Sequence, residues 1–343
     1  MSPLASLANH QIRLAARPVG LPNASNWSHS TEPVAESGEG GIVVKTLAIS
    51  LDPAMRGWMN DGKSYIPPVA IGEVMRAGGV GTVMASNNAD YPVGQAVSVG
   101  TGVQEYLTLE AADFKRAGLV KIDLGVGSLT QWLNVLGMPG MTGYFGLMDV
   151  GMPQPGETVV VSGAAGAVGQ TVGQMAKIKG CRVVGIAGGA DKCAYVQNEL
   201  GVAACVDYKG GKLAADLKAA CPNGIDVYFE NVGGEILDTV LLQMNPFGRI
   251  PVCGLISAYN ATSMPDGPKN LRVVLTQRLT MRGLIVFDWA NRIGEAITQL
   301  GNWAGEGKLK IREDVRTGGI DAFPATLNLL YTGGNNGKLV LKV

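Results

Sequence analysis

Two patterns of hydrophobic and polar positions divide the chain. From about residue 40 to 110, short apolar and β-branched runs alternate with glycine turns, as in GIVVKTLAIS, GGVGTVMAS and GQAVSVGTGVQEYLTL. Closely spaced short strands of this kind predict a barrel-like all-β unit. The segment GKLVLKV (337–343) returns to the same pattern, so we expect it to pair with this first unit.

After about residue 134, apolar runs of strand length alternate with helical stretches. TVVVSG (158–163) predicts a strand, QTVGQMAKIKG (170–180) a helix closed by glycine, CRVVGIAG (181–188) a strand, and DKCAYVQNELG (191–201) another helix. AACVDY, IDVYFENVGG and RIPVCGLIS continue the strands. This alternation predicts an α/β unit built on a parallel sheet with right-handed crossovers.

Composition narrows the classes of function. The chain has 343 residues, 46% of them hydrophobic, which is enough for two domains with separate cores. Lys plus Arg and Asp plus Glu both number 28, so a basic surface that follows nucleic-acid phosphates is not expected. No apolar run approaches the roughly 20 residues that cross a bilayer, and the N-terminus lacks the apolar core of a secretory signal. We therefore expect a cytoplasmic protein with neither a nucleic-acid nor a membrane partner.

Cysteine and histidine are poorly arranged for a metal site. The five cysteines include no C-x-x-C pair, which suits reduced thiols better than a disulfide framework or a structural zinc site. His10 and His29 both lie in the N-terminal segment, far in sequence from any cysteine. A catalytic metal bound by cysteine and histidine is therefore not expected.

A glycine-rich turn lies between the first strand and the first helix of the predicted α/β unit. In SGAAGAVGQ (162–170), Gly163, Gly166 and Gly169 are spaced G-x-x-G-x-x-G. Small residues let the backbone approach a pyrophosphate, and the amides and dipole of the helix N-terminus then meet its charge. The strand before and the helix after are the context that a dinucleotide-binding turn requires. We predict that a dinucleotide binds here.

The next strand indicates which dinucleotide. Sites for the unphosphorylated cofactor place an acid about 20 residues beyond the turn, where it binds the ribose 2′-OH. Here the strand ends in Ala187, Gly188 and Gly189. The missing acid leaves room for a 2′-phosphate, for which Lys192 supplies a cation and Tyr208 a hydroxyl. The sequence favours NADP(H), although Lys192 as a solvated helix residue and Tyr208 as a packing residue remain alternatives.

Seven motifs, in order along nearly the whole chain, resemble one known family. They are LDPAMRGWMND (51–61), SYIPPVAIGEVMRAGGVG (64–81), GMPGMTGYFGL (137–147), SGAAGAVGQ (162–170), ENVGGEILD (230–238), CGLISAYN (253–260) and NNGKLVLKV (335–343). They are similar to the zinc-free medium-chain dehydrogenase/reductases, and most similar to the NADPH-dependent prostaglandin, 2-alkenal and curcumin reductases. IGEVM (71–75) has no histidine where zinc-dependent relatives carry Gly-His-Glu, so the resemblance also implies that no metal is bound.

The resemblance implies an architecture and a reaction. A GroES-like β-barrel catalytic domain (1–133 and 309–343) would accompany a Rossmann doubly wound parallel sheet (134–308), and similar proteins suggest a homodimer. The expected reaction is NADPH-dependent reduction of the carbon–carbon double bond of a small α,β-unsaturated aldehyde or ketone. Hydride adds to the β-carbon while charge develops on the carbonyl oxygen. Tyr259 is the candidate donor to that oxygen, with packing at the domain boundary as its alternative.

The remaining site residues are carried over from the family motifs. The cofactor would be held by Gly166, Ala167, Val168 and Gly169 at the pyrophosphate, by Lys192 and Tyr208 at the adenosine phosphate, and elsewhere by Asn231, Cys253, Gly254, Leu255, Ile256, Ser257, Leu284, Ile285, Val286 and Asn335. Met138 and Thr142 would line the nicotinamide pocket, although helix packing explains them nearly as well. Alternatively, Asn335 is an ordinary turn residue with no role toward the cofactor.

The substrate residues and the choice of substrate stay more open. Arg56 and Tyr65 are expected to border the substrate cleft. Arg56 would clamp a polar tail or, alternatively, support a loop through backbone carbonyls. A quinone reductase shares the expected fold and cofactor, and a non-catalytic NADPH-binding sensor is the alternative of another class.

Overall fold

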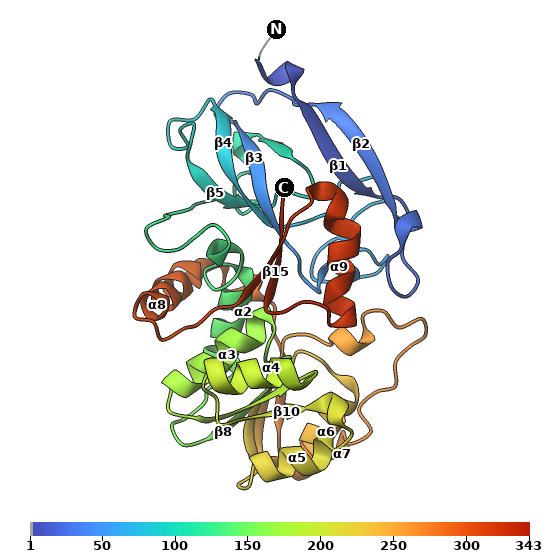
Figure 1. Cartoon of the computed structure of the whole chain (residues 1–343), viewed down its shortest axis with the longest axis vertical. Coiled ribbons are helices and arrows are strands. Elements are labelled where there is room, and N and C mark those ends of the chain that lie inside the picture. Colours follow the sequence, from blue (N-terminus) through green and yellow to red (C-terminus); the bar gives the residue numbers. More distant parts are fainter. Residues whose placement is uncertain (1–2) are drawn as a thin grey trace. The chain divides into compact units, whose positions relative to one another are not determined.

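The computed structural model describes residues 3–343 (Figure 1). The chain divides into two compact units. The barrel unit runs to Leu133 and resumes over Glu313–Val343, and the nucleotide-binding unit is Asn134–Arg312. The second unit extends past the expected residue 308 because two helical glutamines hold the chain there. Gln174 bonds both main-chain groups of Lys310, and Gln170 does the same for Arg312.

A six-stranded parallel sheet forms the centre of the nucleotide-binding unit. Its order is β10-β9-β8-β11-β12-β13, which is the 3-2-1-4-5-6 order of a doubly wound fold. The strands are β8 (Thr158–Ser162), β9 (Arg182–Ala187), β10 (Ala204–Asp207), β11 (Ile225–Phe229), β12 (Met244–Val252) and β13 (Thr280–Gly283). The helices are α2 (Met138–Phe145), α3 (Ala167–Ile178), α4 (Ala190–Ala194), α5 (Leu213–Ala220), α6 (Gly234–Leu241), α7 (Arg272–Thr276) and α8 (Ile293–Gly305). The parallel α/β prediction is confirmed.

The local pattern explains these elements. All five residues of β8 are buried, as expected for a central parallel strand that is covered on both faces. The predicted helix after the glycine turn is α3, and Gly180 follows it at φ +81, where a side chain would be strained. The next predicted helix differs in part. Only α4 is α-helical, and the chain then widens into a π-helical turn over Tyr195–Glu199.

The barrel unit is built on a seven-stranded sheet and a separate two-stranded ribbon. The sheet order is β14-β15-β3-β4-β5-β7, with β6 also paired to β3. The strands are β1 (Ala8–Leu14) and β2 (Trp27–Pro33) in the ribbon, and β3 (Ile42–Ser50), β4 (Gly79–Ser86), β5 (Ala96–Val99), β6 (Tyr106–Leu109), β7 (Val120–Lys121), β14 (Glu313–Arg316) and β15 (Lys338–Lys342) in the sheet. The helices are α1 (Met55–Trp58) and α9 (Phe323–Thr332).

The C-terminal strand completes this sheet from the far end of the chain. β15 lies antiparallel to β3, with Val340 opposite Ser50 and Leu341 opposite Ile49, so the predicted pairing of the tail is confirmed (Figure 1). Leu339 and Leu341 are fully buried in a core that they share with α9. Hydrophobic burial therefore fixes the last strand in the centre of the unit.

Lys338, the first residue of β15, is buried together with a carboxylate. Its Nζ donates to Asp52 Oδ1 at 2.7 Å, to Ser50 Oγ at 2.6 Å and to the Leu51 carbonyl at 2.8 Å. Ser50 Oγ in turn donates to the other oxygen of Asp52. The ammonium thus uses three donors on three acceptors, which offsets the cost of burying its charge.

Candidate cofactor and substrate site

The glycine turn after β8 is as tight as the sequence predicts. Gly163 has φ +61, and the Gly166 amide donates to its carbonyl at 2.9 Å. A Cβ on Gly169 would lie 2.2 Å from that same carbonyl oxygen. Gly163 and Gly169 are therefore required by the backbone itself, because no larger residue fits α3 this close to β8.

The N-terminus of α3 is built to receive an anion. Gly166 is its N-cap, and no side chain caps the first turn. The amides of Ala167, Val168 and Gly169 precede the first residue that can bond within the helix, and they carry the positive end of its dipole. These features fit the pyrophosphate of a dinucleotide.

The backbone conformation and the neighbours of the last residues of β9 explain why no acid follows this strand. Gly189 has φ +98, a conformation that Asp or Glu would adopt only with strain. A Cβ on Gly188 would lie 2.9 Å from the Tyr208 hydroxyl, so Tyr208 already fills the space beside the strand. The structure therefore brings Tyr208 to the strand end from which the acid is missing.

Two further residues at this end were missed by the sequence analysis. Asp207 ends β10, and its Oδ1 accepts from the amides of Gly189 at 2.8 Å and Lys209 at 2.9 Å. The ammonium of Lys209 lies 6.0 Å from the centre of the Tyr208 ring. The acid is thus held by backbone amides, and Lys209 adds a second cation to the one predicted at Lys192. The only signal was the segment DYKGG at the end of a predicted strand.

The carboxyl ends of β8, β11 and β12 meet around Asn231. Its amide donates to Ser162 Oγ at 2.8 Å, and its side-chain Nδ2 donates to the Ser162 carbonyl at 2.7 Å. The loop from Cys253 is hydrogen-bonded alongside, with the Ile256 amide donating to the Asn231 carbonyl. The structure therefore places the predicted Asn231 and the predicted 253–259 loop together at one edge of the sheet.

Burial keeps the thiol in this loop protonated. It raises the pKa of Cys253 to about 12, and the nearby Glu230 adds to the shift. Burial likewise raises the pKa of Glu230 itself, although backbone and serine donors act in the opposite direction. A thiolate nucleophile is thus not expected at neutral pH.

Tyr259 is half-buried, and its hydroxyl turns back over its own loop. The Leu255 amide donates to the phenol oxygen at 3.3 Å, and a Cβ on Gly254 would lie 3.0 Å from it. This bond uses a lone pair of the oxygen and not its proton. Tyr259 therefore accepts a hydrogen bond from the backbone of its own loop.

Two other predicted cofactor segments lie in the nucleotide-binding unit. The Leu284 amide donates to the Val252 carbonyl at 3.1 Å, so 284–286 leaves β13 next to the end of β12. Leu284 also packs on the π-helical turn Gly146–Gly151 that follows α2, where a Cβ on Gly146 would lie 2.9 Å from it. On α2, Thr142 Oγ1 donates to the Met138 carbonyl at 2.7 Å, as the helix-packing alternative requires. A role for either residue toward the cofactor stays a prediction.

The predicted substrate residues belong to the barrel unit. Arg56 is only 3% exposed, and its guanidinium donates to the carbonyls of Gly20 at 3.1 Å and Pro18 at 3.0 Å. Trp58 Nε1 donates to the Tyr65 hydroxyl at 2.9 Å, while the Tyr65 ring is half exposed. Arg56 thus has the contacts of the loop-supporting alternative, and its substrate-clamping role stays a prediction, as does that of Tyr65.

Asn335, the remaining cofactor residue, lies before β15. Its Nδ2 donates to the Gly337 carbonyl at 2.9 Å, as expected if Asn335 is an ordinary turn residue. A role toward the cofactor stays a prediction.

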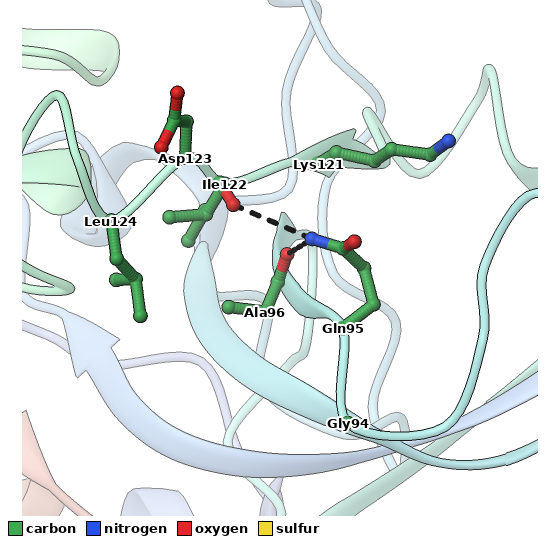
Figure 2. Close-up of a pocket in the computed structure, with 7 residues that line it drawn as sticks. All are labelled: Gly94, Gln95, Ala96, Lys121, Ile122, Asp123 and Leu124. Carbon is green, nitrogen blue, oxygen red and sulfur yellow. Dashed lines mark hydrogen bonds between the residues drawn. The ribbon is translucent and has the colours of Figure 1, made fainter.

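A separate pocket of about 470 Å³ in the barrel unit is lined by Gly94, Gln95, Ala96 and 121–124 (Figure 2). Gln95 bridges its two sides by donating to the carbonyls of Ala96 and Ile122. None of the predicted site residues lines this pocket.

No group of three or more His, Cys, Asp and Glu side chains in residues 3–343 is placed to hold a metal ion. Within the same range, no helix has both the length and the hydropathy to span a bilayer.

Known proteins identify the family. A profile described as the N-terminal domain of oxidoreductase matches residues 10–117, and one described as zinc-binding dehydrogenase matches residues 167–302. NADPH-dependent curcumin reductase from Escherichia coli (strain K12) is 45% identical, over 98% of this chain and 97% of its own. The chain belongs to the zinc-independent medium-chain dehydrogenase/reductases.

Other members of this reductase family agree with the assignment. The 2-alkenal reductase (NADP(+)-dependent) of Nicotiana tabacum is 38% identical over 98% of both chains. The crystal structure of CurA from Vibrio vulnificus in complex with NADPH is 42% identical, with a TM-score of 0.90 over 97% of this chain and 99% of that one. The predicted fold and the resemblance to this family are therefore confirmed.

Proposed function

We propose that this protein is an NADPH-dependent reductase that saturates the carbon–carbon double bond of small α,β-unsaturated aldehydes and ketones. The observation that supports the proposal is the loop after β12, in which the Leu255 amide bonds the Tyr259 hydroxyl and the Ile256 amide bonds the Asn231 carbonyl, in a fold whose relatives are named for curcumin, prostaglandin and 2-alkenal reduction. The cofactor supplies a hydride to the β-carbon of the substrate.

The chain's own groups fit that cofactor in three places. The uncapped first turn of α3 suits the pyrophosphate. Tyr208, Lys192 and Lys209 suit an adenosine 2′-phosphate, because β9 itself does not end in an acid and the nearby Asp207 is engaged by the amides of Gly189 and Lys209. The segments 253–259 and 284–286 would hold the nicotinamide half.

Tyr259 would stabilise the developing charge. Its hydroxyl donates a hydrogen bond to the carbonyl oxygen of the substrate, on which negative charge accumulates as the β-carbon is reduced. The α-carbon of the enolate then takes a proton from Tyr259 or from water, which gives the saturated carbonyl. A neutral phenol suits this step, because it is a donor at physiological pH.

Turnover of Tyr259→Phe tests the proposed reaction. We expect kcat for an alkenal to fall about 100-fold or more, the usual loss for one oxyanion donor. Tyr91→Phe, which removes a hydroxyl outside the predicted site, is the matched control. Absorbance of NADPH is followed with alkenals, long enones, curcumin-like diarylheptanoids and a naphthoquinone. Unchanged kcat in Tyr259→Phe would dismiss its role.

The substrate panel also decides between the alternatives. Turnover of the naphthoquinone without turnover of any enone would make the protein a quinone reductase. Bound NADPH that no substrate oxidises would instead support a sensor. Homodimer formation stays a prediction, and light scattering of the purified protein tests it.

Cofactor preference has a separate test. Loss of one charged hydrogen bond to a phosphate costs on the order of tenfold or more in affinity. We therefore expect Lys192→Ala to weaken NADPH binding by that factor and to leave NADH binding unchanged. Lys179→Ala, which removes a lysine at the C-terminal end of α3, is the control. Equal effects on both cofactors would contradict the assignment of Lys192.

A further inference from the structure

Glu230 is a fully buried carboxyl group at the point where three strands of the nucleotide-binding sheet end. Its Oε1 accepts from Ser162 Oγ at 2.8 Å and from the Val232 amide at 2.5 Å. Its main-chain carbonyl accepts from the amides of Cys253 at 2.9 Å and Gly254 at 3.2 Å. One residue thus joins the ends of β8, β11 and β12.

The two partners of its carboxyl group lead directly to the proposed site. Ser162 Oγ, which donates to Glu230, also accepts from the Asn231 amide at 2.8 Å. The carbonyl of Val232 accepts from the Ser257 amide at 3.0 Å and from Ser257 Oγ at 2.6 Å. Asn231 and the Tyr259 loop are therefore each one hydrogen bond beyond the residues that Glu230 holds.

No cation accompanies this carboxyl group in the part of the chain that the structure describes. Oε2 of Glu230 and the Tyr228 hydroxyl are both buried, and among the described residues neither has a hydrogen-bond partner of ordinary geometry. The titratable groups that face Glu230 are Tyr228 from β11 and Cys253 after β12, and burial raises the pKa of both. Burial disfavours the ionised form of Glu230 and raises its pKa, while the backbone and hydroxyl donors around it act in the opposite direction.

We propose that Glu230 is a positioning residue, which holds Asn231 and the Tyr259 loop in register through Ser162 and Val232. This inference rests on the proposed function, because the loops that Glu230 aligns are those assigned to the cofactor and the substrate carbonyl. Because both donors bond to a single oxygen, Oε1, an amide should be able to replace the acid. Glutamine keeps an acceptor oxygen for both donors, whereas methionine has a similar length and no acceptor.

The experiment compares Glu230→Gln with Glu230→Met in the full chain. Methionine leaves a buried amide and a buried hydroxyl without their acceptor, so we expect the Kd for NADPH to rise and kcat to fall by about tenfold or more. Glutamine should stay within about threefold of wild type in both. Val227→Ala, a buried apolar truncation in the same strand, controls for stability loss alone. We expect Val227→Ala to lower the melting temperature and to leave the Kd for NADPH and kcat unchanged.

Hydrogen exchange without cofactor gives a readout that is independent of turnover. We expect the amides of 253–259 to lose protection in Glu230→Met and to keep it in Glu230→Gln. If Glu230→Met does not fold, Ser162→Ala breaks the same connection and should show the loss at Asn231. If the wild-type protein reduces no enone, the proposed function is rejected. The Kd for NADPH and the hydrogen exchange of the variants would still test the role of Glu230. Equal damage in the Gln and Met variants, or none in either, would overturn the inference.

Discussion

Asp52 and Glu230 are both buried carboxyl groups, one in each unit, and they differ in what surrounds them. Asp52 is 6% exposed and receives the ammonium of Lys338 at 2.7 Å and the hydroxyl of Ser50. Glu230 is 0% exposed and receives one hydroxyl and one amide on a single oxygen. The first carboxyl is matched by a charge, and the second is matched only by neutral donors.

This difference separates two uses of a buried acid. The Asp52 pair joins β15 to the chain that follows β3, over a sequence separation of 286 residues, and so holds the barrel together. Glu230 joins loops that are already neighbours in the sheet, and so adjusts their register. A charged pair fits the architectural task, because breaking it is costly. An acid held by neutral donors fits the positioning task, because its acceptor oxygen needs no cation beside it.

Lys338→Met gives the largest expected effect. It leaves Asp52 buried without its cation, so we expect the free energy of unfolding of the barrel unit to fall by about 3–5 kcal/mol. Urea denaturation followed by tryptophan fluorescence measures this, since Trp27 and Trp58 lie in the barrel core.

The double variant Asp52→Leu with Lys338→Met is the control for that loss. Replacing both charges by apolar groups should recover most of the stability, because no charge is then left uncompensated. A double variant as unstable as Lys338→Met would show that the shape of the lysine, and not the charge pair, stabilises the unit.

The pH dependence of stability sharpens the comparison at Glu230. Burial raises its pKa above the ordinary 4.5, so its contribution is complete below that pH and is lost as pH rises toward the folded pKa. Relative to Glu230→Gln, wild type should therefore lose stability from pH 5 upward, by at most about 1.4 kcal/mol per pH unit. Denaturation at several pH values measures the difference.

Glu157 provides the control of opposite sign. Burial opposes its ionisation, but donors from Arg249 and Gln154 outweigh this and lower its pKa below 4.5. Its contribution is thus present above that pH and is lost as pH falls through the folded pKa. A flat difference between wild type and Glu230→Gln would mean that Glu230 is ionised in the folded chain.

The smallest expected effect is at a surface pair. Lys308 lies 2.6 Å from Glu306, with both side chains more than half exposed. We expect Lys308→Met to change the free energy of unfolding by no more than about 0.5 kcal/mol, and salt to abolish even that. If Lys308→Met lowered the free energy of unfolding as much as Lys338→Met does, burial could not be the reason that the two ion pairs differ.

Local pattern was enough to predict the elements that carry the candidate site. β8, α3 and β9 follow from an apolar run, a helical period and a glycine at each turn, all within about 30 residues. The sequence alone shows that Gly189 stands where an acid is expected. Only the structure shows that the φ of Gly189, +98, favours glycine there. These features depend on neighbours in sequence, so the sequence contains them.

Burial of polar groups could not be predicted in the same way. Glu230 follows a strand, where an acid commonly faces a ligand or solvent, and its burial depends on the backbone of β12 lying across it. Lys338 stands in a strand pattern, but lysine is rarely buried unless paired, and its partner is far away in sequence. Both facts require the tertiary fold, as do the loop contacts of Arg56.

The inner position of β15 also has a consequence for biosynthesis. Residues Lys338–Lys342 fill the place between β14 and β3, so β3 leaves the ribosome long before that neighbour has been translated. The whole of Asn134–Arg312 emerges in the interval and can fold first. Until then the nascent barrel half exposes an unpaired strand edge, and such edges are prone to aggregation.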